Sequence, residues 1–207
     1  MLSETAWNIA AFLATSVRVA EVGQIARIFC SGELAQAEQA LQKLEGAGWA
    51  ESVSVLIPEV MPLSKPLYTW RRRPPGPNTG AMEWIAEKRV RALSVVEKRV
   101  YFASIRGARR IGGFGGFRAP HQCWHDLMLS ACYECLSSVL LDLSGRWLSE
   151  DCYKRDFPGR PAPDAMILDA GTGQPCLAVD VVGPSYGATG RLKKFHEDFR
   201  WLAYQLW

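Results

Sequence analysis

The sequence predicts a mixed α/β protein, of the α+β type, in which two domains follow one another. Segments with the apolar period of amphipathic helices alternate with short apolar runs typical of strands. A segment rich in proline, glycine and arginine, residues 71–80, separates the two domains. The chain has 207 residues, of which 48% are hydrophobic, so it can bury a full core and is neither disordered nor fibrous.

The first 70 residues are expected to form three helices and then a two-stranded hairpin. Apolar residues recur at helical spacing in residues 3–16, 19–29 and 31–50. Residues 50–57 alternate as a strand does, and residues 65–70 are expected to pair with them across a loop that contains prolines. Three helices and a hairpin in this order are typical of a winged helix, which we assign to residues 1–72.

The third predicted helix has a mixed surface. A winged helix that reads DNA does so with basic or amide side chains of this helix, and Gln39 and Lys43 are the candidates here. Its glutamates, Glu33, Glu38 and Glu45, are unfavourable next to phosphates. Two interpretations therefore stay open: DNA reading, and the docking of a second copy or another protein partner.

Positive charge is concentrated in the middle of the chain. Residues 61–120 carry thirteen basic and three acidic side chains, whereas the segments before and after them have net charges of −4 and −3. Such a local excess attracts a polyanion, which makes DNA the expected partner. The candidate DNA-binding residues of this region are Lys65, Arg71, Arg72, Arg73, Arg109, Arg110 and Arg118.

Two parts of this basic region have plain structural alternatives. Residues 73–98 are interpreted as a basic linker and helix. Their charged side chains can be solvated by water without any bound partner. The glycine-rich run that follows, "GGFGGF", carries Phe114 and Phe117. These rings either stack on the bases of a single strand or pack into the core of the protein.

Residues 99–207 are expected to form the second domain, with a hairpin as its chemical centre. In "PAPDAMILDAGTGQPCLAVDVVG", Asp164 opens one strand and Asp180 ends the next, so the hairpin brings both carboxylates to the same end. Magnesium prefers oxygen ligands and takes one or two carboxylates from a protein. Glu150 is available as a third acid, and Lys193 or Lys194 from the last helix as a cation. The alternative is an ordinary hairpin with turn-capping aspartates.

Several protein classes are not expected. No apolar run is long enough to cross a bilayer, and residues 1–10 lack the pattern of a signal peptide, so we expect a cytoplasmic protein. Six cysteines include a single C-x2-C pair, Cys132 and Cys135, in a helical segment. Buried reduced thiols explain them better than a zinc site does.

The order of several short motifs resembles the bacterial replication-relaxation family. A winged helix is followed by "HDL", a W-x-x-E segment, "PDA", and a strand that ends in an acid before a final helix. The residues that carry this resemblance are His125, Asp126, Leu127, Trp147, Glu150, Pro163, Asp164, Ala165, Asp180, Tyr186, Arg191, Leu192, Phe195 and His196.

That family is similar to plasmid mobilisation relaxases, with a winged helix joined to a PD-(D/E)XK, restriction-endonuclease-like domain. The resemblance implies a DNA-binding protein of plasmid or mobile-element processing. It places Asp164 and Asp180 at the metal-binding positions, for Mg²⁺ or Mn²⁺, and Glu150 at the acidic position on the helix side. An active protein would be a metal-dependent nicking endonuclease or relaxase.

The chain departs from the family pattern at the second acid. The family is expected to have glutamate where Asp180 stands, and a lysine where Val182 stands. Two hypotheses remain. In the first, Lys193 or Lys194 replaces the missing lysine, with Tyr186 as a weaker candidate nucleophile. In the second, the protein is a non-enzymatic transcriptional regulator or adaptor that retains a degenerate nuclease fold.

Overall fold

The computed structural model describes residues 2–60, 62–73, 76–140, 142–183 and 190–207. Helices and strands are interspersed along the chain, so the predicted α/β class is confirmed. The chain forms two compact units, each made of two separate segments. Unit 1 comprises Met1–Pro62 and Val95–Ser144, and unit 2 comprises Leu63–Ser94 and Gly145–Trp207.

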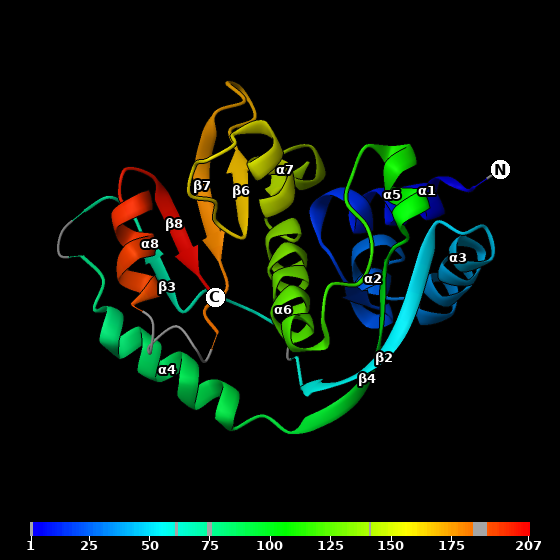
Figure 1. Ribbon diagram of the computed structural model, residues 1–207, viewed down its shortest axis with the longest axis horizontal. Helices are drawn as coiled ribbons and strands as arrows, with labels where there is room; N and C mark the ends of the chain where they lie inside the picture. Colours follow the sequence, from blue (N-terminus) through cyan, green and yellow to red (C-terminus); the bar gives the residue numbers. More distant parts are fainter. Residues whose placement is uncertain (1, 61, 74–75, 141, 184–189) are drawn as a thin grey trace. The chain divides into compact units, whose positions relative to one another are not determined.

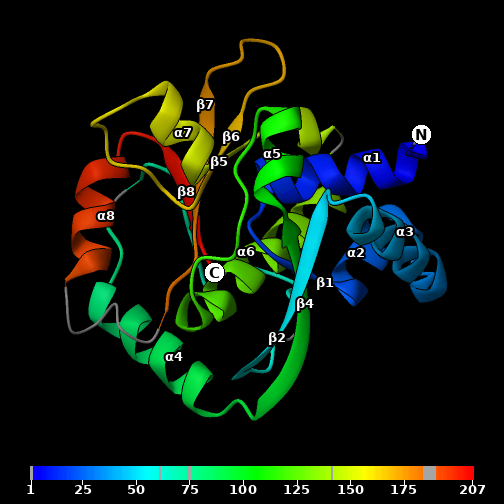
Figure 2. The ribbon, with the colours of Figure 1, turned by 45° about the vertical axis from the view of Figure 1, so that its right-hand side comes forward.

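Unit 1 combines helices with a three-stranded antiparallel sheet whose strand order is β1-β4-β2. Figure 2 shows this sheet beside the first three helices. Its elements are α1 (Glu4–Ala11), the π-helix η1 (Phe12–Ser16), β1 (Ala20–Glu21), α2 (Val22–Phe29), α3 (Leu34–Gly46), β2 (Ala50–Pro58), β4 (Val95–Ala103), α5 (Ile105–Ile111) and α6 (Pro120–Ser137). A 3-10 turn, η2 (Leu143–Gly145), follows α6.

The helices of unit 1 begin where the sequence offers capping groups. Ser3 Oγ accepts a hydrogen bond from the backbone N–H of Ala6 and starts α1. Glu21 and Gln24 form a capping box at the start of α2. Helix α3 buries Leu41 and Leu44 completely, as its apolar spacing predicts.

The predicted pairing of the first hairpin is wrong. Strand β2 pairs with β4, from Ala50 opposite Ala103 to Pro58 opposite Val95. The segment expected to pair with β2 instead forms β3 (Tyr68–Trp70), which pairs with β8 (Ala203–Leu206) in unit 2. Alternation identifies a strand but does not name its partner, and Trp70 is buried among the aromatic residues of unit 2.

The compact units also differ from the boundaries expected at residues 72 and 98. Residues 63–94 belong with 145–207, and residues 95–144 belong with the first 62. The chain therefore leaves unit 1 between two strands that are hydrogen-bonded to each other, and it returns after α4 (Thr79–Arg91).

Unit 2 is built on a five-stranded mixed sheet with the order β3-β8-β7-β6-β5. Strands β5 (Trp147–Ser149), β6 (Ala165–Leu168) and β7 (Pro175–Asp180) form an antiparallel meander. Helix α8 (Arg191–Phe199) then connects β7 to β8, which is parallel to β7. Helix α7 (Glu150–Asp156) follows β5, and the sheet with α8 is seen in Figure 1.

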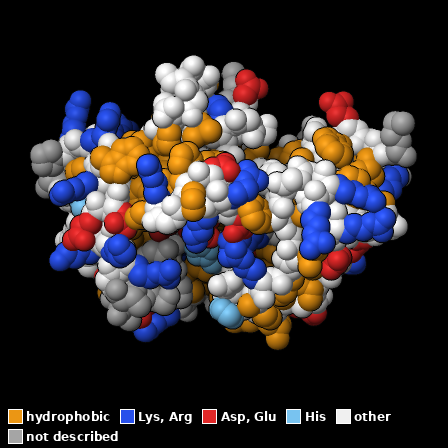
Figure 3. Space-filling view, turned by 45° about the horizontal axis from the view of Figure 1, so that its top comes forward, with side chains coloured by type: hydrophobic (Ala, Val, Ile, Leu, Met, Phe, Trp, Pro, Cys, Tyr) orange, Lys and Arg blue, Asp and Glu red, His pale blue; other side chains and the backbone are white. Residues whose placement is uncertain are grey.

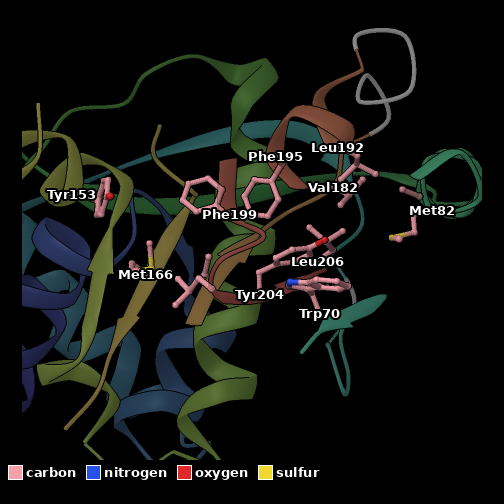
Figure 4. Close-up of a cluster of buried hydrophobic side chains, with 13 residues drawn as sticks. Trp70, Met82, Tyr153, Met166, Val182, Leu192, Phe195, Phe199, Tyr204 and Leu206 are labelled. Atoms are coloured by element: carbon pink, nitrogen blue, oxygen red, sulfur yellow. The ribbon is translucent and has the colours of Figure 1, made fainter. Parts of the chain in front are cut away.

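The core of unit 2 lies between one face of this sheet and the helices that cover it. Met166, Ala178 and Tyr204 are side chains of neighbouring strands that point to this face. Helix α8 contributes Leu192, Phe195 and Phe199 to the same cluster (Figure 4), and α4 contributes Met82 and Ala86.

Within the described residues, no helix is both long and apolar enough to cross a membrane. None of the six cysteines, all of which lie in the described residues, is in a disulfide. The C-x2-C pair lies on α6, with Cys132 buried and Cys135 half-buried.

Candidate functional site

Three acidic residues stand side by side at one end of the sheet of unit 2. Ala165 is opposite Val179, so the next pair outward is Asp164 and Asp180. In the same way Ser149 is opposite Ala165, and the next pair outward is Glu150 and Asp164. Side chains opposite one another in a sheet point to the same face. Glu150, Asp164 and Asp180 are called the acid row below.

Backbone hydrogen bonds hold the acid row in place. The N–H of Glu150 donates to the carbonyl oxygen of Asp164 at 3.0 Å, which extends the β5–β6 ladder by one step. Asp164 Oδ2 accepts from the N–H of Val181 at 2.7 Å. The carbonyl oxygen of Asp180 accepts from the N–H of Trp207 at 3.0 Å. The row is thus fixed by the ends of four adjacent strands.

A lysine that the sequence analysis did not consider contacts the acid row. Lys154 Nζ lies 2.5 Å from Glu150 Oε1, four residues away on α7. The Lys154 side chain is 55% exposed and that of Glu150 25% exposed. The spacing of four residues on a helix, acid first, is the signal that could have found this pair.

Val182, where the family pattern described above would have a lysine, is buried. Val182 is 2% exposed and belongs to the core cluster of unit 2, which also contains Leu192 (Figure 4). Its backbone N–H donates to the carbonyl oxygen of Trp207 at 2.9 Å. An uncharged β-branched side chain fills this place because the surrounding groups are apolar.

The two lysines expected to replace it lie on the exposed side of α8. The side chains of α8 that pack into the core are Leu192, Phe195 and Phe199, whereas Lys193 and Lys194 are exposed. Lys194 Nζ lies 3.1 Å from the Asp198 carboxylate, one turn further along the helix. No described contact brings either lysine to the acid row.

The donor set of the acid row fits a hard divalent cation in part. Asp164 and Asp180 are adjacent carboxylates, and two carboxylates with water suffice for Mg²⁺. The third acid, Glu150, is engaged by Lys154. The described residues contain no group of three or more acidic, histidine or cysteine side chains arranged to hold a metal ion.

His196 on α8 belongs to the aromatic core. Its Nδ1 lies 2.8 Å from Tyr204 Oη, and its ring packs edge-on against Trp70 at 5.0 Å. Burial lowers the pKa of His196 and raises the pKa of Tyr204. The histidine is therefore held as a neutral packing group.

The remaining motif residues are placed as follows. His125 and Asp126 lie on α6 in unit 1, with His125 Nδ1 3.6 Å from Asp126 Oδ1, and Asp126 is buried. Tyr186, the candidate nucleophile, lies outside the described residues.

The predicted DNA-binding residues divide between the two units. Gln39, Lys43, Arg109, Arg110 and Arg118 belong to unit 1, and Lys65, Arg71, Arg72 and Arg73 to unit 2. All nine side chains are exposed. On the face seen in Figure 3, acidic side chains lie among the basic ones.

Arg109 and Arg110 line an open groove of about 850 Å³ in unit 1. The same groove contains Arg106, which the sequence analysis did not select, although its spacing of three and four residues places it on the same helical face. The other lining residues are Gly48, Glu51, Phe102, Ser104, Ile105, Gly116 and Phe117.

The glycine-rich run beside the groove packs closely against unit 1. A Cβ on Gly113 would lie 2.3 Å from the carbonyl oxygen of Ala14, and one on Gly115 would lie 2.6 Å from that of Ser104. The Phe117 ring packs against Phe102 with centroids 5.5 Å apart, whereas Phe114 is 39% exposed. One of the two phenylalanines is thus packed and the other is largely open to solvent.

Comparison of the chain with protein-family models, curated proteins and solved structures gave no match.

Proposed function

We propose that the chain is a DNA-binding protein of plasmid or mobile-element processing, in which unit 2 is a metal-dependent nuclease core of the restriction-endonuclease type. The acid row carries this proposal, because it aligns three carboxylates at the ends of neighbouring strands. An antiparallel meander followed by a helix and a parallel strand supports it, since this order is the one expected for a PD-(D/E)XK core.

Unit 1 would serve as the DNA-binding module. Its order of helix, strand, two helices and two strands, with β4 between β1 and β2, agrees with a winged helix. The usual short wing is replaced by the excursion through residues 63–94, which belongs to unit 2. The exposed Gln39 and Lys43 of α3 would face a DNA groove.

In this proposal Asp164 and Asp180 would hold Mg²⁺ or Mn²⁺, with Glu150 beside them. The bound ion would supply a polarised phosphate and an activated water. Lys154 contacts the acid row through its ion pair with Glu150. It would stabilise negative charge that develops on the phosphate during hydrolysis.

The test is the nicking of supercoiled plasmid DNA in Mg²⁺ or Mn²⁺, together with the thermal unfolding of the protein in the same ions. We expect nicking and a metal-dependent rise in Tm for the native chain. Asp164→Asn should lose both, with nicking reduced roughly 100-fold or more. Asp169→Asn is the matched control in the same hairpin, because Asp169 is exposed and caps the turn through Gly171 and Thr172.

The role of Lys154 gives a second expected result. Lys154→Ala should bind Mn²⁺ more tightly, because a positive charge leaves the site, while nicking falls about 10-fold to 100-fold. Lys193→Ala should change neither quantity, since Lys193 is exposed on α8. Calorimetric titration with MnCl₂ and the nicking assay measure both. Loss of nicking in Lys193→Ala alone would assign the cation to α8 instead.

The burial of Val182 favours a second candidate function, a non-enzymatic DNA-binding regulator or adaptor with a degenerate nuclease core. In that case Lys154 would permanently occupy Glu150 as an ordinary helix ion pair. The native chain would then bind DNA, show no rise in Tm with Mg²⁺ or Mn²⁺, and leave plasmid DNA intact.

A further inference from the structure

The groove of unit 1 has three arginines on one wall. Arg106, Arg109 and Arg110 follow one another at helical spacing on α5, and all three side chains are exposed. None of them forms an ion pair with a carboxylate among the described residues, and Glu51 is the one acid in the lining. The guanidinium of Arg110 lies 5.2 Å from the centre of the Trp49 ring. The wall therefore has a net positive charge.

The helix that carries these arginines is fixed to its surroundings. Ser104 Oγ accepts from the N–H of Gly107 at 2.9 Å and donates to the carbonyl oxygen of Gly48 at 2.7 Å. The N–H of Ser104 donates to the carbonyl oxygen of Trp49 at 3.0 Å. The backbone of α5 is thus held against the turn that follows α3, so the arginines project from a rigid support.

Another part of the lining is aromatic. Phe117 is half-buried and packs on the buried Phe102, so its ring has a fixed position in the groove. The N–H of Gly116 donates to the carbonyl oxygen of Ala103 at 2.8 Å, which fixes the backbone next to Phe117. A fixed ring and three guanidiniums in one groove match a ligand with both flat apolar surfaces and regularly spaced negative charges.

We propose that this groove binds single-stranded DNA, with phosphates at Arg106, Arg109 and Arg110 and a base against Phe117. A duplex offers phosphates to the arginines, but its bases are stacked inside and leave the ring without a partner. The proposal rests on the proposed function only in taking DNA as the polyanion. It requires neither the acid row nor a metal ion.

The experiment measures the fluorescence anisotropy of a labelled oligothymidine of 20 nucleotides with the full chain in EDTA. The triple variant Arg106→Ala, Arg109→Ala, Arg110→Ala should bind at least 10-fold more weakly at low salt. The slope of log K against log salt should fall by about 2, because three phosphate contacts to a single strand contribute about 0.7 each. The matched control removes Lys88, Arg89 and Arg91, three exposed cations of α4, and should bind as the native chain does.

The aromatic contact is tested by Phe117→Leu, which keeps an apolar side chain against Phe102. Affinity for the single strand should fall about fivefold or more, and the weaker affinity for a duplex of equal length should not change. Circular dichroism of each variant before binding separates lost contacts from lost folding.

Three results would overturn the proposal: native affinity in the arginine triple variant, an equal loss in the α4 control, or tighter binding of the duplex with no effect of Phe117→Leu. The last result would make the groove a duplex-binding surface. Asp164→Asn should bind the oligonucleotide as the native chain does in EDTA. A failure of metal-dependent nicking thus leaves this proposal standing, and weak single-strand binding leaves the nuclease proposal standing.

Discussion

Gly107→Ala is expected to lower the free energy of unfolding by about 2 to 4 kcal/mol, although alanine is the better helix former. Gly107 lies within α5, and a Cβ there would stand 2.4 Å from the carbonyl oxygen and 2.8 Å from the Cα of Trp49. Backbone atoms cannot rotate aside as a side chain can, so α5 must move away from the turn after α3. Urea denaturation followed by tryptophan fluorescence measures the change.

Gly46→Ala is the matched control, because Gly46 is also helical but has no atom of the described structure within 4 Å of its added Cβ. It should raise the free energy of unfolding by about 0.5 kcal/mol. Opposite signs for the two substitutions separate close packing from helix propensity. Equal and small changes in the free energy of unfolding would show that α5 is not held against Trp49. The arginines of the groove would then lack a rigid support.

Val182→Lys is expected to destabilise the protein by roughly 3 to 5 kcal/mol at pH 7. Val182 is 2% exposed, so the new ammonium would be buried among apolar groups. Burial should lower the pKa of this lysine in the folded state. The penalty is then complete below the folded pKa and shrinks as the pH rises towards the unfolded value of about 10.4.

Urea denaturation at pH 7 and pH 9.5 measures this effect. The difference in the free energy of unfolding between the variant and the native chain should be smaller at the higher pH. Val182→Met is the uncharged control with a longer side chain; it should cost about 1 to 3 kcal/mol through overpacking, and this cost should not depend on pH. A Val182→Lys variant as stable as Val182→Met, with stronger plasmid nicking, would contradict the inference. That result would place the new ammonium at the acid row. It would also show that valine at position 182 keeps the nicking activity of the native chain low.

The sequence predicted those features that depend on neighbours along the chain. The hairpin of residues 161–183 has the expected strands, because a glycine turn separates two apolar runs, and the register then places Asp164 opposite Asp180. The alignment of Glu150 with them depends on the pairing of β5 with β6, which no local pattern specifies.

Other features could not be read from local patterns. Residues 50–58 have the alternation of a strand, and the nearest strand-like segment along the chain, residues 65–70, was the expected partner. The observed partner, β4, is separated from β2 by 36 residues. The pairing of β3 with β8 is accompanied by the stacking of Trp70 on Tyr204. Such packing between distant segments leaves no periodic pattern in the sequence. Lys154 lies on α7, away from the position after the second acid where the family pattern has its lysine, so that pattern does not point to it.

The chain passes from one unit to the other three times, and this order has a consequence for how the protein can fold during synthesis. Unit 2 needs β8, an interior strand of its sheet, and β8 is made of residues 203–206. When β3 and α4 leave the ribosome, the strand that pairs with β3 does not yet exist, whereas β4 is made directly after α4 and can then pair with β2. Unit 1 is therefore expected to form first, while residues 63–94 wait as a long loop. Joining residue 58 directly to residue 95 through a short turn, and ending the chain at residue 144, should yield unit 1 alone, since residues 58 and 95 are already opposite each other.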